Sequence, residues 1–344
     1  MPAIAVYQAM NGWQVHRYRR QASSHIDLQR QGYSSMYPIS PELAAFVAKT
    51  ASFTGDDSSL AGLRQAYNHM CRAFTAPTPE GLAVTDFSLA GRGVRSYLPT
   101  MLGPADGWPC LLYIHGGGWV VGGLDSHDFI CVELASALQV LVIAIDYRLA
   151  PEHPFPAAYE DCRAVWRAIQ AGQGPHAINR QRLVVMGDSA GGNLAAALCL
   201  GLRDDGEPQP RAQVLIYPGL GGPADLPSRR DCRDAPLLSS ADTDSYLALY
   251  LQGSGKPSPY AMPLLAADFS GLPKAFIAVA QFDPLRDDGI LYAERLQAAG
   301  VTAVLYPGKG LVHGCLRARR QVPEVDRLYD YLLDYLGSEG LTQV

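Results

Sequence analysis

The chain has 344 residues, of which 48% are apolar and 18% charged, and its formal net charge at pH 7 is −5. This composition excludes an intrinsically disordered chain, and the mild acidity gives no electrostatic reason to expect nucleic acid or an anionic membrane as a partner. The seven cysteines are scattered and contain no C-x-x-C pair, so they predict reduced, mostly buried thiols rather than a zinc site or a disulfide framework.

The N-terminal part of the chain favours helices. Its first 20 residues lack the basic start, apolar stretch and cleavage site of a signal peptide, and no apolar run could span a bilayer, so a cytoplasmic chain without stable membrane association is expected. Helix-like stretches cover 41–49 and 58–74, and a proline-rich linker follows at 76–81. We interpret residues 1–75 as part of a helical cap, separate from a catalytic domain at 80–344.

Strands then alternate with amphipathic helices. Residues 84–89 and 94–98 flank the sequence AGRG and predict a hairpin. Short apolar runs, typical of parallel strands buried on both faces, follow at 110–114, 140–145, 183–186, 212–217, 275–280 and 303–306. Helices are expected between them at 128–138, 157–171, 191–203, 285–299 and 323–336. This alternation predicts a doubly wound α/β fold with a mostly parallel sheet and helices on both faces.

One segment, residues 219–262, interrupts the alternation. Its ends are rich in glycine and proline, and it contains a helical piece near 241–250. An insertion after the carboxyl end of a strand can fold over the ligand crevice of such a sheet. We therefore expect it to complete the cap with the N-terminal helices, although an ordinary crossover helix with long loops is the alternative.

The sequence GDSAG at 187–191 carries the first chemical signal. An apolar strand precedes it and a helix-forming run follows it, which is the setting of the G-x-S-x-G nucleophile elbow. The sharp turn requires small neighbours and projects the hydroxyl of Ser189 into the crevice. Ser189 is therefore the candidate nucleophile, and the alternative is a glycine-rich turn with a capping serine.

The sequence HGGGW at 115–119 follows another strand. Glycines let the backbone approach a substrate closely, and backbone N–H groups aimed at a tetrahedral oxyanion stabilise it. A phosphate-binding turn would require a P-loop pattern or a nearby lysine, and neither is present. We interpret this loop as part of an oxyanion hole, in which His115 is a structural hydrogen-bonding residue rather than the catalytic base.

Four blocks together resemble the hormone-sensitive-lipase-like family of bacterial esterases. They are HGGGW at 115–119, DYRLAPEHPFPAAYED at 146–161, GDSAGGNLAA at 187–196 and DPLRDDG at 283–289, in the order that the family has them. The resemblance covers about residues 80–335. It implies an α/β-hydrolase fold with an eight-stranded sheet, oxyanion donors at the N–H groups of Gly117, Gly118 and Ala190, and short- to medium-chain carboxylic esters as substrates. The Ala190 donor also follows from the mechanism alone.

A serine nucleophile requires a base and an acid that orients the base. In this fold both follow the serine, and His313 is the only histidine after Ser189. Among the acids that follow the strand at 275–280, Asp283 lies nearest to its end, and the resemblance selects it too. Asp287 and Asp288 are expected in the first turn of the next helix.

The chain departs from the family after the last histidine. Members of the family have an aromatic residue where this chain has Cys315. The alternatives are that the smaller residue widens the pocket, that it alters only the packing, or that its thiol is a second nucleophile near His313. Tyr33 and Tyr37 stand in an unusual N-terminal segment, which affects the shape expected for the cap.

The sequence thus predicts a serine carboxylesterase that acts on small-molecule esters through an acyl-enzyme, with no cofactor and no metal. The alternatives are an amidase or deacetylase acting on an acylated small molecule, which would use the same triad, and a non-catalytic ligand receptor. The receptor is disfavoured because the three triad residues are present. Association into a homodimer through an edge strand is compatible with the fold, but no sequence feature specifies it.

Overall fold

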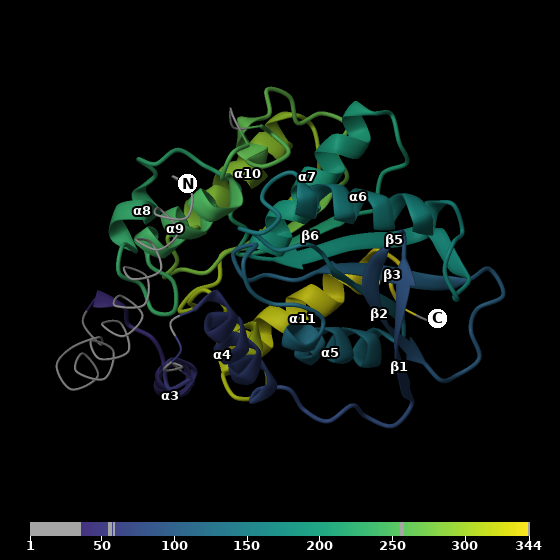
Figure 1. The fold of residues 1–344 in the computed structure, drawn as a ribbon, viewed down its shortest axis with the longest axis horizontal. Coiled ribbons are helices and arrows are strands. Elements are labelled where there is room, and N and C mark those ends of the chain that lie inside the picture. The colour runs from purple at the N-terminus through teal and green to yellow at the C-terminus, as the bar shows by residue number, and fades with distance from the viewer. Residues whose placement is uncertain (1–35, 54–56, 58, 255–257, 343–344) are drawn as a thin grey trace.

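One eight-stranded sheet organises the molecule. The computed structural model describes residues 36–53, 57, 59–254 and 258–342. Their strands follow the order β1-β2-β4-β3-β5-β6-β7-β8, with helices on both faces (Figure 1). The prediction of an α/β fold with a mostly parallel eight-stranded sheet is confirmed.

The strands agree closely with the apolar runs of the sequence. They are β1 (Leu82–Leu89), β2 (Arg92–Pro99), β3 (Trp108–Ile114), β4 (Leu141–Asp146), β5 (Ile178–Asp188), β6 (Gln213–Ile216), β7 (Ala275–Ala278) and β8 (Ala303–Tyr306). The hairpin β1–β2 is antiparallel, β2 pairs antiparallel with β4, and the later pairings are parallel. The expectation that every apolar run is buried on both faces is wrong for β8, which is partly exposed because it is an edge strand.

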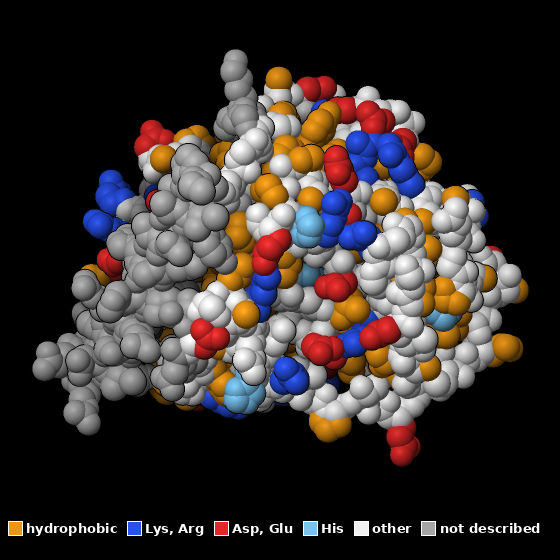
Figure 2. All heavy atoms as spheres, viewed as in Figure 1, with side chains coloured by type: hydrophobic (Ala, Val, Ile, Leu, Met, Phe, Trp, Pro, Cys, Tyr) orange, Lys and Arg blue, Asp and Glu red, His pale blue; other side chains and the backbone are white. Residues whose placement is uncertain are grey.

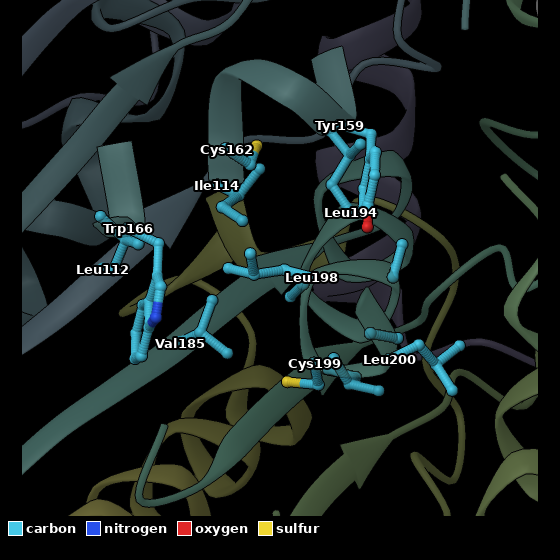
Figure 3. Close-up of a cluster of buried hydrophobic side chains, with 14 of the residues drawn as sticks. Leu112, Ile114, Tyr159, Cys162, Trp166, Val185, Leu194, Leu198, Cys199 and Leu200 are labelled. Atoms are coloured by element: carbon cyan, nitrogen blue, oxygen red, sulfur yellow. The ribbon is translucent and has the colours of Figure 1, made fainter. Parts of the chain in front are cut away.

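Two helical layers cover the sheet. Helices α6 (Ala157–Gln170), α7 (Ala190–Asp204) and α10 (Arg286–Ala298) pack on one face, and α5 (Asp128–Leu138) and α11 (Pro323–Ser338) pack on the other. Figure 3 shows side chains of the first layer, among them Trp166 and Leu198, over Leu112 and Val185 of the strands. All four side chains are fully buried, so the central strands cannot shift relative to the helices without opening voids.

The remaining elements lie at the carboxyl end of the strands. They are α3 (Pro41–Ala51), α4 (Leu60–Arg72), α8 (Pro227–Asp231), α9 (Ser240–Tyr250) and the short helices η1 (Asp125–His127), η2 (Pro263–Leu265) and η3 (Cys315–Ala318). Figure 1 shows α3, α4, α8 and α9 gathered at one end of the molecule. Arg64 fastens α4 there, since its guanidinium pairs with Glu152 at 2.8 Å and donates to the carbonyl of Val120 at 2.8 Å.

The surface agrees with the composition. Acidic and basic side chains are interspersed over the face in Figure 2 rather than gathered into one patch. Among the residues that the structure describes, no helix is both long and apolar enough to cross a bilayer. All seven cysteines are buried and free, as expected for reduced thiols.

Candidate active site

Ser189 stands alone between strand and helix. Strand β5 ends at Asp188 and helix α7 begins at Ala190, and the backbone at Ser189 has φ 54° and ψ −118°. The turn packs so tightly that a Cβ at Gly191 would lie 2.0 Å from the carbonyl oxygen of Ile114. Only glycine fits there, and the elbow consequently contacts the end of β3, from which the glycine-rich loop departs.

His313 connects Ser189 to Asp283. Its Nε2 is 2.9 Å from Oγ of Ser189, and its Nδ1 is 2.7 Å from Oδ2 of Asp283. Asp283 is fully buried, and its Oδ1 accepts the N–H of Leu285 at 2.8 Å. The structure therefore brings together the three residues that the sequence singled out, in the order hydroxyl, imidazole, carboxylate.

The glycine-rich loop presents free donors beside Ser189. Gly117 and Gly118 have φ values of 118° and 58°, and neither N–H has an acceptor within the part of the chain that the structure describes. Ala190 is the first residue of α7, where an N–H has no intrahelical acceptor. These three residues also line the same cavity as Ser189, so their N–H groups suit an oxyanion.

Asp188 holds the loop against the elbow, a role that the sequence analysis missed. Its carboxylate accepts the N–H of Gly116 at 3.0 Å and the hydroxyl of Tyr113 at 2.7 Å. Burial opposes its ionisation, but His127 and the hydrogen bond from Tyr113 outweigh burial and lower the pKa of Asp188 to about 2. A charged residue directly before the nucleophile, at a position expected to be buried, was the signal for this role.

Asn193 was also missed. It lies in the first turns of α7 and its side-chain amide donates to the carbonyls of Gly219 at 2.8 Å and Ala261 at 3.0 Å. These two residues are the ends of the 219–262 insertion. The side chain of Asn193 therefore holds both ends of the insertion beside Ser189.

His115 and Cys315 do not face the cavity. The ring of His115 stacks on Tyr147 at 4.2 Å, its Nδ1 is 2.7 Å from the carbonyl oxygen of Gly116, and burial lowers its pKa to about 3. It is therefore a neutral structural residue. Cys315 lies in the core beneath the sheet, and burial raises its pKa to about 12, so it is neither a nucleophile nor part of the cavity wall.

Asp287 and Asp288 are in the first turn of α10, as expected. Asp287 accepts the N–H of Ser228 at 2.7 Å. Asp288 is fully buried and pairs with Arg229 of α8 at 2.7 Å. Both acids are therefore engaged by the insertion, whereas Asp283 alone of the three contacts His313.

A cavity of about 890 Å³ opens over Ser189 and His313. Its walls include apolar side chains from α4, among them Leu63 and Met70, and from the insertion, among them Leu238 and Leu247. Residues from both segments that the sequence assigned to a cap thus line the cavity beside Ser189, but residues 1–35 and their Tyr33 lie outside the described part. Within that part, no cluster of histidine, cysteine and acidic side chains could hold a metal ion.

Known proteins resemble most of this chain. Residues 111–317 match the family model for the alpha/beta hydrolase fold. Carboxylesterase NlhH of Mycobacterium tuberculosis is 42% identical over 234 residues, which cover 67% of this chain and 73% of the relative. The ester hydrolase EH1AB1 from the metagenome of Lake Arreo is 36% identical, with a TM-score of 0.79 over 88% of this chain and 100% of its own. An esterase of the bacterial hormone-sensitive lipase family is 29% identical, with a TM-score of 0.79 over 87% of this chain and 98% of its own.

Proposed function

This chain belongs to the hormone-sensitive-lipase-like group of the α/β hydrolase family and is a carboxylic ester hydrolase, and from that premise we propose that Ser189, His313 and Asp283 form its catalytic triad. The observation that carries the proposal is the continuous pair of contacts from Ser189 Oγ through His313 to the buried carboxylate of Asp283. A weakly nucleophilic hydroxyl requires this arrangement of base and orienting acid.

The reaction proceeds in two steps. Ser189 Oγ attacks the ester carbonyl while Nε2 of His313 takes its proton, and the N–H groups of Gly117, Gly118 and Ala190 bind the oxyanion. His313 then donates the proton to the departing alcohol. A water molecule, deprotonated by the same nitrogen, hydrolyses the acyl-enzyme and releases the acid and Ser189.

Helices α3 and α4 and the 219–262 insertion act as a cap over this site. A cavity of about 890 Å³ falls within the usual size of pockets for small ligands, and short- to medium-chain acyl groups are the substrates that we propose for it.

The test uses p-nitrophenyl esters from acetate to palmitate. Ser189→Ala is expected to lower kcat by at least about 10³-fold, while Ser270→Ala, at an exposed serine outside the cavity, leaves it unchanged. Near-normal hydrolysis by a folded Ser189→Ala protein would overturn the triad. A maximum at palmitate would overturn the chain-length proposal and leave the triad intact.

A further inference from the structure

Arg317 is a buried cation in the wall of the active-site cavity. It lies in η3, four residues after His313, and its side chain is only 9% exposed. A Cβ on Gly314 would lie 3.0 Å from its Nη2, so the guanidinium packs against the residue that follows His313. The cavity wall includes Arg317, Gly314, His313 and Ser189 together.

The charge of Arg317 has no counterion in the described ranges. No carboxylate there lies within ion-pair distance of its guanidinium, and its buried Nε has no hydrogen-bond partner. By contrast, Arg229, which also lines the cavity, pairs with Asp288 at 2.7 Å. Burying a guanidinium without a counterion costs folding free energy, because part of its hydration is lost and no carboxylate replaces it.

The surroundings of Arg317 neither neutralise nor deprotonate it. Burial acts to lower its pKa, but the neighbouring groups Cys71, Tyr67, Tyr217 and Asp188 raise the pKa above its ordinary value. Asp188 is the only carboxylate among these groups, and it is already bound by Tyr113 and by the backbone of the oxyanion loop. Tyr67 and Tyr217 line the same cavity and offer hydroxyl groups beside the cation.

We propose that Arg317 is a specificity-determining residue that binds a carboxylate carried by the ester substrate. A guanidinium presents several N–H donors in one plane, which matches the two oxygens of a carboxylate. The preferred substrate is then an ester with a second, ionised acid group, such as the monoester of a dicarboxylic acid. This inference rests on the proposed function, because the carboxylate is placed relative to Ser189 and His313.

The experiment compares charged and neutral esters of matched length. One pair places the carboxylate in the acyl part, mono-p-nitrophenyl glutarate against p-nitrophenyl pentanoate, and a second places it in the alcohol part, 4-acetoxybutyrate against butyl acetate. The measured quantity is the ratio of kcat/KM for the charged ester to kcat/KM for the neutral ester. The ratio is expected to fall about 10- to 100-fold in Arg317→Met for at least one pair. This is the size expected when a hydrogen bond between two charged groups is lost.

Two further variants make the result specific. Arg317→Lys keeps the charge and is expected to restore part of the ratio, with a higher KM because the planar donor fork is lost. Arg72→Met removes the same charge from an exposed position on α4, outside the cavity. It is expected to change the ratio less than about twofold, because solvent and salt screen an exposed charge.

The outcomes separate this inference from the proposed function. If Arg317→Met lowers both members of each pair equally, or if its ratio equals that of the wild type, Arg317 is structural and the inference is wrong, although the triad stands. If the wild type hydrolyses no ester of either kind, the proposed function itself is wrong. If Arg317→Met does not fold, the ratio of kcat/KM values is compared between the wild type and Arg317→Lys instead. Equal ratios in these two proteins would contradict the inference.

Discussion

At the residue scale, the two carboxylate oxygens of Asp283 make two different contacts. Oδ2 is 2.7 Å from Nδ1 of His313, and Oδ1 accepts the N–H of Leu285 at 2.8 Å. The backbone contact fixes the direction of the carboxylate, and the carboxylate fixes which nitrogen of His313 carries the proton. Nε2 is then left without a proton and can accept one from Ser189.

Asp283→Asn is expected to lower kcat by about 10³- to 10⁴-fold with little change in KM, because an amide at this position favours the wrong tautomer of His313. Asp287→Asn is the matched control, because it makes the same loss of charge nearby in the chain but Asp287 does not contact His313. Its carboxylate accepts the N–H of Ser228 instead. Steady-state kinetics on p-nitrophenyl butyrate measure both. A large loss in Asp287→Asn, with Asp283→Asn unaffected, would reassign the acid.

Residues of the site differ in how far the sequence could predict them. Ser189 has a local pattern, and His313 follows by elimination, so the sequence alone could propose both. Asp188 and Arg317 have no such pattern, because their roles depend on which groups surround them after folding. Without Gly116 and Tyr113, the buried carboxylate of Asp188 would lose two of its hydrogen bonds and would not hold the glycine-rich loop.

At the scale of elements, the oxyanion loop is held between the sheet and the cap. Its position depends on Gly118, which has φ 58° and lies beneath the ring of Tyr246 in α9. A Cβ at this position would be 2.4 Å from Cδ1 of that ring. The donors of the loop therefore keep their direction only while residue 118 has no side chain.

Gly118→Ala is expected to lower kcat about 10²- to 10³-fold, because the added methyl group displaces the loop and with it an oxyanion donor. Gly206→Ala tests the backbone effect alone, since Gly206 has φ 67° and open space around it. That control is expected to cost about 1 kcal/mol of stability, from the positive φ, with unchanged kcat. Equal kcat values for the two variants, measured on p-nitrophenyl butyrate, would contradict the role of the loop.

The helices and strands were predicted well because each is specified by its own local sequence, as β3 is by a continuous apolar run. The placement of the 219–262 insertion was harder to predict, since it depends on contacts between distant residues. Asn193 binds the carbonyls of Gly219 and Ala261, and the insertion therefore begins and ends beside the nucleophile. The local sequence indicated the helix α9 but carries no information on these hydrogen bonds.

At the scale of the whole molecule, a buried ion pair connects the insertion to the sheet domain. Asp288 of α10 is fully buried and pairs with Arg229 of α8, and its Oδ2 accepts the N–H of Leu220 at 2.8 Å. Arg229 also donates to the carbonyl of Pro284, next to Asp283. The stability of the insertion and the position of Asp283 are thus coupled through one guanidinium.

Arg229→Met is expected to lower the free energy of unfolding by about 3 kcal/mol at pH 8, because it leaves the buried carboxylate of Asp288 without its counterion. Burial already raises the pKa of Asp288, while Arg229 and the backbone N–H groups oppose the rise. Removing Arg229 therefore raises that pKa further. The folded variant then binds a proton that the unfolded chain releases, so the stability of the variant increases as the pH falls.

The loss in Arg229→Met, measured against the wild type by urea unfolding, should accordingly be smaller at pH 5 than at pH 8. Adding Asp288→Asn to Arg229→Met removes the charge that causes this dependence, so the double variant should regain stability at pH 8 and its difference from the wild type should vary less with pH. A loss of the same size at both pH values would mean that Arg229 stabilises the cap by packing and by its contact with Pro284. The charge of Asp288 would then contribute nothing to the connection between the insertion and the sheet.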